Sequence, residues 1–201
     1  MSKNKYFSHI SKTNPESNSL PPLQKKILLH LAENNPQTIN EVAKKIGHQY
    51  KASWVAFESL KKKDLIQEVD LKEYRNRSYP LFWLTDVGII LSCIEGASLD
   101  SLIEKAEKIY PNNKTLHIIL DLASTFNKNV WRTVYYSAKA KGTFDYGDLA
   151  NILLIQMAAE NTPEKLSELK CKLKKYSETY DTIKSSLEAM CEIIKDFFEE
   201  D

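Results

Sequence analysis

Glycine is scarce in this sequence, and the few glycines present are not spaced for phosphate binding. There are five, at positions 47, 88, 96, 142 and 147. No two of them are two residues apart, which excludes the G-x-G-x-x-G fingerprint of dinucleotide-binding folds, and none begins a G-x-x-x-x-G-K phosphate loop. We therefore expect neither of these nucleotide-binding chemistries.

Cysteine and histidine are also few, and neither is arranged for metal or redox chemistry. The three cysteines are odd in number and widely spaced, so they predict neither a disulfide framework nor a C-x-x-C pair. The four histidines have no H-E-x-x-H or Cys-His spacing, and no G-x-S-x-G nucleophile motif occurs. We expect no metal site, no cofactor and no catalytic residues, and hence no enzyme.

Long apolar runs and an excess of one charge are both missing. No stretch reaches about 18 uninterrupted apolar residues, and the first twenty residues lack the apolar run of a signal peptide. The 28 basic and 27 acidic side chains leave a net charge of +1, so any electrostatic function must be local. With 42% hydrophobic and 27% charged residues, the composition predicts a globular cytoplasmic protein that binds no membrane.

Residues 1–20 form a polar segment rich in Ser, Asn and Lys. This composition predicts a flexible arm that ends at the two following prolines. Lys3, Lys5 and Lys12 could touch phosphate, although short polar termini are more often simply solvated.

Two helices are expected at the start of the next segment, residues 21–96. A helical apolar pattern runs from Pro22 to an Asn-Asn-Pro cluster that ends it. A second, short helix begins at Thr38, which forms a capping-box pattern with Glu41, and Gly47 closes it.

A third helix, a hairpin and a fourth helix follow. The third helix is expected over 49–63, and its apolar face consists of Ala52, Ala56, Phe57 and Leu60. The runs 66–71 and 78–84 are rich in β-formers and predict a hairpin with a long polar loop over 72–77. Thr85 and Asp86 then cap a helix that runs to Ile94 and is stopped by Gly96.

These elements resemble those of a known family of proteins. Residues 38–66, TINEVAKKIGHQYKASWVAFESLKKKDLI, contain a capping Thr, an E-[LV]-A core, a glycine turn and a helix ending in L-x-x-x-x-L-I. This stretch resembles the helix-turn-helix of the MarR and PadR families of transcriptional regulators. Residues 75–88, RNRSYPLFWLTDVG, are similar to the wing of those families. The resemblance covers residues 22–96 and implies a winged helix-turn-helix that binds double-stranded DNA.

The resemblance also implies which residues face DNA, because a helix fits the major groove and a neighbouring hairpin reaches the minor groove. The expected contacts are Gln49, Tyr50, Lys51, Trp54 and, in the wing, Lys72, Arg75, Asn76 and Arg77, with Val55 beside Trp54. Gln49 suits an adenine edge and Lys51 a guanine or a phosphate. Trp54 suits either a sugar or thymine methyl group or, alternatively, a protein partner. Asp64 replaces the glycine that ends this helix in those families, and Asp tolerates the left-handed conformation better than most residues.

Residues 97–201 show only helical patterns, and the last helix, which Thr162 and Pro163 open, has the most regular one. Its apolar positions alternate in spacings of three and four, as in a coiled coil. This seam consists of Leu166, Leu169, Leu173, Tyr176, Tyr180, Ile183, Leu187, Met190, Ile194 and Phe197. The seam predicts a homodimer, and a helical hairpin within one chain is the alternative. Other helices are expected over about 98–110, 114–126, 129–140 and 148–160.

The expected fold is thus mainly α, with an N-terminal winged helix-turn-helix that has a two-stranded β-wing, followed by an all-α dimerisation region. Residues 1–95 carry 14 basic and 10 acidic side chains, and the rest carry 14 and 17, so the half with the hairpin is the basic one. The aromatic residues Trp131, Tyr135, Tyr136, Phe144 and Tyr146 fill the core or, alternatively, line an effector pocket. The leading hypothesis is a homodimeric, sequence-specific transcriptional regulator. The alternative is a protein-interaction module of a larger assembly.

Overall fold

The computed structural model describes residues 20–123, 128–141 and 163–177, and positions 180, 181, 184, 185, 188, 189 and 192. Its elements are α1 (Pro22–Glu33), α2 (Ile39–Ile46), α3 (Tyr50–Lys62), β1 (Ile66–Tyr74), β2 (Arg77–Leu84), α4 (Asp86–Glu95), α5 (Leu99–Ile109), α6 (Lys114–Leu122), α7 (Lys128–Lys141) and α9 (Pro163–Leu173). The described chain is mainly helical, with a two-stranded antiparallel sheet after the first three helices, an order compatible with a winged helix. The expected N-terminal arm and the segment 148–160 lie outside the described residues.

The first three helices pack around a common apolar core, and the expected caps define α2. Ile27, Leu28 and Phe57 are completely buried there. Thr38 forms the predicted capping box with Glu41, and Gly47 adopts the left-handed conformation, φ 70°, that ends α2. A short helix of eight residues is stable here because both ends are satisfied and its apolar face is covered.

The buried face of α3 differs from the expected apolar face at one position. Ser53 is buried together with Ala56, Phe57 and Leu60, whereas Ala52 is exposed. The small size of serine lets it occupy a core position, and its hydroxyl finds no hydrogen-bond partner there. Asp64 follows α3 at φ 55°, so the left-handed conformation expected for this aspartate is confirmed.

The hairpin is longer and its turn tighter than the sequence predicts. The strands β1 and β2 extend through the expected loop 72–77 and pair up to Tyr74 and Arg77. Only Arg75 and Asn76 form the turn, with φ of 51° and 58°. Two positive φ values fit a type I′ turn, whose twist matches that of the strands. The prediction of a long loop is therefore wrong, because the sequence has none of the glycines that usually mark such a turn.

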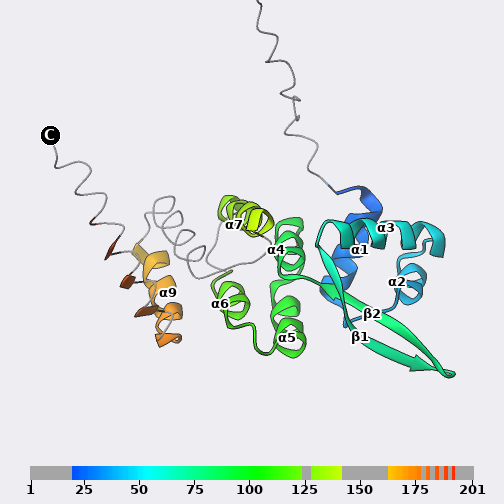
Figure 1. Ribbon diagram of the computed structural model, residues 1–201. Coiled ribbons are helices and arrows are strands. Elements are labelled where there is room, and N and C mark those ends of the chain that lie inside the picture. The colour runs from blue at the N-terminus through cyan, green and yellow to red at the C-terminus, as the bar shows by residue number, and fades with distance from the viewer. Residues whose placement is uncertain are drawn as a thin grey trace, which may run out of the picture.

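Side chains and backbone tie the base of the hairpin to the helices around it. The Trp83 indole Nε1 donates to the carbonyls of Leu31 and Asn34, at 2.8 and 3.1 Å, and so satisfies the C-terminal end of α1. The backbone of Gln37 forms a bridge with Phe82. These contacts fix where the hairpin leaves the body of the protein, and Figure 1 shows it projecting beyond the helices.

The turn before α4 explains the Thr-x-x-Gly pattern of the sequence. The Thr85 hydroxyl accepts from the N–H of Gly88 at 3.1 Å and donates to the carbonyl of Asp64 at 2.6 Å. A Cβ atom at Gly88 would lie 1.9 Å from the carbonyl oxygen of Leu65. Glycine is required there because the helix approaches the backbone of residues 64–65 too closely for any side chain.

The C-terminal helices continue from α4 toward the other end of the molecule (Figure 1). α7 packs on α4, α6 on α5, and α9 on α6. Tyr110, just after α5, joins this region to the hairpin, because its hydroxyl donates to the carbonyl of Leu84 and accepts from the Gln67 amide at 2.9 Å. Within the described ranges, no helix has the length and apolar character needed to cross a membrane.

The expected unbroken C-terminal helix is interrupted. α9 ends at Leu173, and the N–H groups of Lys175 and Tyr176 bond to carbonyls three residues earlier, at 3.1 and 3.0 Å. Leu173 is buried in the core of its own chain. The Tyr176 hydroxyl donates to the Asp121 carboxylate on α6 at 3.2 Å. The predicted coiled coil is not confirmed, because these two seam residues pack within one chain.

Candidate nucleic-acid interface

The outer face of α3 carries large side chains that are open to solvent. Tyr50, Trp54 and Val55 are exposed by 54%, 47% and 56%. Tyr50 and Trp54 are four residues apart, as are Lys51 and Val55, so the four side chains form two adjacent stripes on one side of the helix. Side chains of this size are usually covered, and their exposure makes this face a candidate contact surface.

Two further residues predicted to contact DNA, Gln49 and Lys51, lie at the start of this face. Gln49 occupies the N-cap position of α3, but its side chain makes no capping hydrogen bond. Lys51 is exposed and forms none of the ion pairs found in the described part of the chain. Both side chains can therefore turn toward a partner at no cost to the fold.

The tip of the hairpin presents two arginines. Both strands are exposed from Leu71 to Tyr79, and Arg75 lies in the turn with its guanidinium 5.1 Å from the centre of the Tyr74 ring. Neither Arg75 nor Arg77 has an ion-pair partner among the described residues. A tight turn holds these cations and Asn76 at the far end of a projecting arm.

Lys72, the remaining residue predicted to contact DNA, is already engaged. Its ammonium group forms a salt bridge with the Glu41 carboxylate. The other carboxylate oxygen of Glu41 accepts from the backbone N–H and the hydroxyl of Thr38, both at 2.9 Å. The hydrogen bonds from Lys72 and Thr38 hold the pKa of Glu41 below its ordinary value, so this carboxylate is charged at neutral pH.

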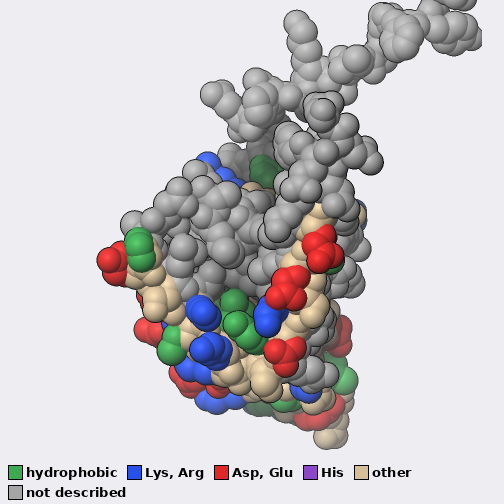
Figure 2. All heavy atoms as spheres, turned by 90° about the vertical axis from the view of Figure 1, so that its left-hand side faces the viewer, with side chains coloured by type: hydrophobic (Ala, Val, Ile, Leu, Met, Phe, Trp, Pro, Cys, Tyr) green, Lys and Arg blue, Asp and Glu red, His purple; other side chains and the backbone are tan. Residues whose placement is uncertain are grey.

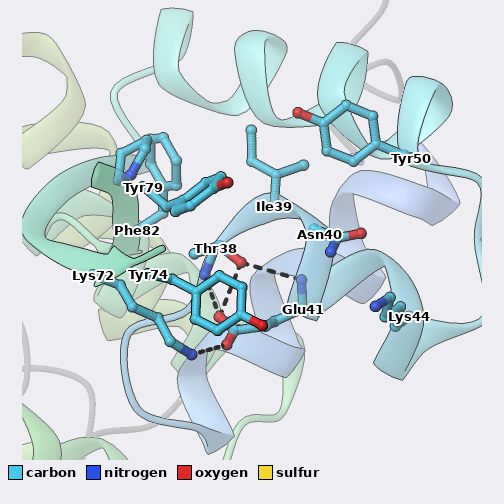
Figure 3. A pocket seen from close by; sticks show the side chains of 11 residues that line it. Thr38, Ile39, Asn40, Glu41, Lys44, Tyr50, Lys72, Tyr74, Tyr79 and Phe82 are labelled. Carbon is cyan, nitrogen blue, oxygen red and sulfur yellow. Dashed lines mark hydrogen bonds and ion pairs between the residues drawn. The ribbon is translucent and has the colours of Figure 1, made fainter. Parts of the chain in front are cut away.

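A groove of about 610 Å³ separates the hairpin from α2 and the start of α3 (Figure 3). Its lining consists of Thr38, Ile39, Asn40, Glu41, Lys44, Tyr50, Lys72, Tyr74, Tyr79, Pro80 and Phe82. The sequence interpretation missed Asn40, Lys44, Tyr74 and Tyr79. Strand pairing places Lys72 opposite Tyr79 and Tyr74 opposite Arg77. The side chains of these two pairs therefore share one face of the hairpin. The residues on that face can be identified only when the two-residue turn, which sets the pairing of the strands, is known.

The aromatic residues of the C-terminal region lie partly in the core and partly on the surface. Trp131 is buried and Tyr135 packs on the core, whereas Tyr136 is 51% exposed; Phe144 and Tyr146 lie outside the described residues. On the α9 side of the molecule, Figure 2 shows basic and acidic side chains interspersed. In the part of the chain that the structure covers, no group of three His, Cys, Asp or Glu side chains is placed to hold a metal ion.

Three of the predicted seam residues pack on the core of their own chain. Tyr180 is partly buried and packs on the core, as Leu173 and Tyr176 do. The side chains of Leu166, Leu169, Ile183, Leu187, Met190, Ile194 and Phe197 lie outside those that the structure describes.

Comparison with known proteins adds no family. The sequence matches no protein-family model and no curated protein significantly.

Proposed function

We propose that this protein is a sequence-specific, double-stranded DNA-binding transcriptional regulator. The observation that carries the proposal is the pairing of an exposed helix face with an arginine-tipped hairpin on the same small unit. The sequence resemblance to the MarR and PadR regulators supports the same function.

In this proposal α3 enters the major groove and the hairpin tip enters the adjoining minor groove. The side chains of Gln49, Lys51 and Val55 reach base edges, where an amide suits adenine, an ammonium suits guanine and an aliphatic group suits a thymine methyl. Arg75 and Arg77 bind phosphates or the narrow minor groove and supply much of the affinity.

Homodimerisation is part of the same proposal. Two half-sites about 34 to 36 Å apart are bound together only if a second chain is held at a fixed distance. Leu173, Tyr176 and Tyr180 pack within one chain, so a dimer would use other seam positions. The test is sedimentation of the full chain and of a chain that ends at Glu160. A full chain that is dimeric and a truncated chain that is monomeric support this assignment. The same number of protomers in both contradicts it.

The second candidate is a protein-interaction module. It is favoured by the apolar character of the exposed face, since Tyr50, Trp54 and Val55 would also serve as anchors for another protein.

Binding to mixed-sequence duplex DNA at increasing salt separates the two functions. For a DNA-binding protein, the logarithm of the affinity falls linearly with the logarithm of the salt concentration, by about 0.9 for each phosphate contact. Replacing Arg75 and Arg77 by Ala lowers that slope, whereas Arg132→Ala with Lys139→Ala, which removes two exposed charges from α7, leaves it unchanged. A full chain that binds no duplex DNA at low salt would refute the proposal.

A further inference from the structure

We infer that the groove between α2, α3 and the hairpin seats the DNA strand that separates the major from the minor groove, and that Lys72 neutralises the one carboxylate in its lining, that of Glu41. The inference rests on the proposed function and extends it to Glu41, Asn40, Lys44, Tyr74 and Tyr79, which the resemblance does not name as DNA contacts.

In B-DNA, neighbouring major and minor grooves share one sugar–phosphate strand as their common wall. If α3 occupies the major groove and the hairpin tip the next minor groove, that strand has to cross the space between α3 and the hairpin. The groove lies in this position, because Tyr50 lines it from the first turn of α3 while Tyr74 and Tyr79 line it from β1 and β2.

The lining of the groove combines aromatic, amide and cationic side chains. Figure 3 shows the three tyrosines, from α3 and from both strands, around the same space as Asn40 and Lys44 of α2. Tyrosine offers a flat apolar ring that packs on deoxyribose and a hydroxyl that donates to a phosphate oxygen. Lys44 is exposed and forms no ion pair among the described residues. This set suits a sugar–phosphate chain, which alternates apolar sugars with charged phosphates.

The lining also contains one carboxylate, that of Glu41. An unpaired negative charge there would repel phosphate, and Glu41 remains ionised because its hydrogen bonds hold its pKa low. Lys72 cancels this charge by direct contact. Lys72 is therefore a positioning and neutralising residue, and its charge is used within the protein.

Three variants test this assignment through binding to a mixed-sequence duplex over a range of salt concentrations. Glu41→Gln removes the negative charge but keeps the capping box, since glutamine serves at the same position. We expect it to release Lys72 for a phosphate, so that the salt slope steepens by about 0.9 and the affinity rises about tenfold at roughly 0.1 M salt. Lys72→Met leaves Glu41 unpaired and weakens binding. In the double variant positions 41 and 72 again have no net charge, and we expect it to bind like the wild type.

A direct contact between Lys72 and DNA gives a different pattern. In that case Glu41→Gln has little effect, and the double variant binds as weakly as Lys72→Met. The Glu104–Lys108 pair of α5, both exposed, provides the matched control. Glu104→Gln, Lys108→Met and their combination change the net charge by the same amounts and should leave binding unchanged. If the α5 variants changed binding as much as the groove variants do, net charge would explain the result and the inference would be overturned.

The tyrosines are tested in the same assay. Tyr74→Phe and Tyr79→Phe each lose one hydroxyl donor, and we expect about a threefold loss of affinity with the salt slope unchanged, since neither carries charge. Tyr136→Phe on α7 is the control. Binding by the wild type together with unaltered binding by the groove variants overturns the seat and leaves the DNA-binding function standing. A wild type that binds no DNA overturns both.

Discussion

The N-terminal unit of α1–α4 and the hairpin differs from the C-terminal helices in how its elements are delimited. In the N-terminal unit nearly every boundary has a local cause: the capping box at Thr38, the left-handed residues Gly47 and Asp64, and the Thr85 cap of α4. In the C-terminal region Ser98 and Asn113 cap the starts of α5 and α6, at 3.5 and 3.1 Å, but α9 stops at a turn without glycine or proline. The comparison shows that local stop signals define an element more reliably than an apolar repeat does.

The interrupted seam illustrates the weakness of the repeat. Spacings of three and four indicate a helix with one buried face, but they do not state which surface covers that face. Here α6 of the same chain covers part of the apolar face of the last helix. The Asp121 carboxylate on α6 accepts a hydrogen bond from the Tyr176 hydroxyl and forms an ion pair with Lys175 at 3.9 Å. Such contacts between segments distant in the chain leave no mark in a local pattern.

The largest effect is expected from Gly88→Ala, which tests whether the tight junction before α4 organises the N-terminal unit. The new Cβ would overlap the carbonyl oxygen of Leu65, so we expect a loss of about 3 kcal/mol or more in the free energy of unfolding. Urea denaturation measures it. Gly47→Ala, which meets no atom within 4 Å and only has to adopt a left-handed φ, should cost about 1 kcal/mol. Equal costs would show that α4 shifts freely.

The next largest effects are expected from two tyrosines, one that links the hairpin to the C-terminal helices and one that links α6 to the segment after α9. Tyr110→Phe removes the hydroxyl that links Leu84 and Gln67, and we expect a loss of about 1 to 2 kcal/mol in the free energy of unfolding. Tyr176→Phe removes one hydrogen bond, to the partly exposed Asp121, and should cost less than about 1 kcal/mol. The reverse order would mean that α6 and α9 are coupled more tightly than the two regions are to each other.

The same tyrosine predicts a dependence on pH. Burial raises the pKa of Tyr110 to about 12 from an ordinary value of 10.0. Between these values the unfolded chain loses the phenolic proton before the folded chain does, so rising pH favours unfolding. The difference in unfolding free energy between the wild type and Tyr110→Phe should thus be constant below pH 10 and shrink from there to about pH 12. A difference that grows over this range would contradict the assigned burial.

A smaller effect of opposite sign is expected at Ser53. Its buried hydroxyl has no hydrogen-bond partner, so Ser53→Ala removes an unsatisfied polar group and inserts a better helix former. We expect a gain of about 1 kcal/mol in the free energy of unfolding, measured by thermal and urea denaturation. Ser92→Ala is the contrasting variant, because the equally buried Ser92 hydroxyl donates to the Gly88 carbonyl at 2.7 Å, and its removal should destabilise.

The sequence predicts the order of elements in the N-terminal unit well because capping and turn residues act on their neighbours. It does not predict the hairpin turn, since Arg75 and Asn76 adopt positive φ without the usual glycine. The candidate site depends on that turn. The strand face that brings Tyr74 and Tyr79 beside α2, and the salt bridge from Lys72 to Glu41 across 31 positions of the chain, arise from tertiary packing.

The distribution of the three tryptophans gives the molecule its own optical reporters. Trp83 is buried at the base of the hairpin, Trp131 is buried in α7, and Trp54 alone is half exposed, on α3. The emission of Trp54 should lie toward the red and be open to a collisional quencher such as acrylamide, while that of the other two is shielded. Any partner that covers α3 therefore protects one fluorophore out of three, and the unlabelled protein reports on its own candidate interface.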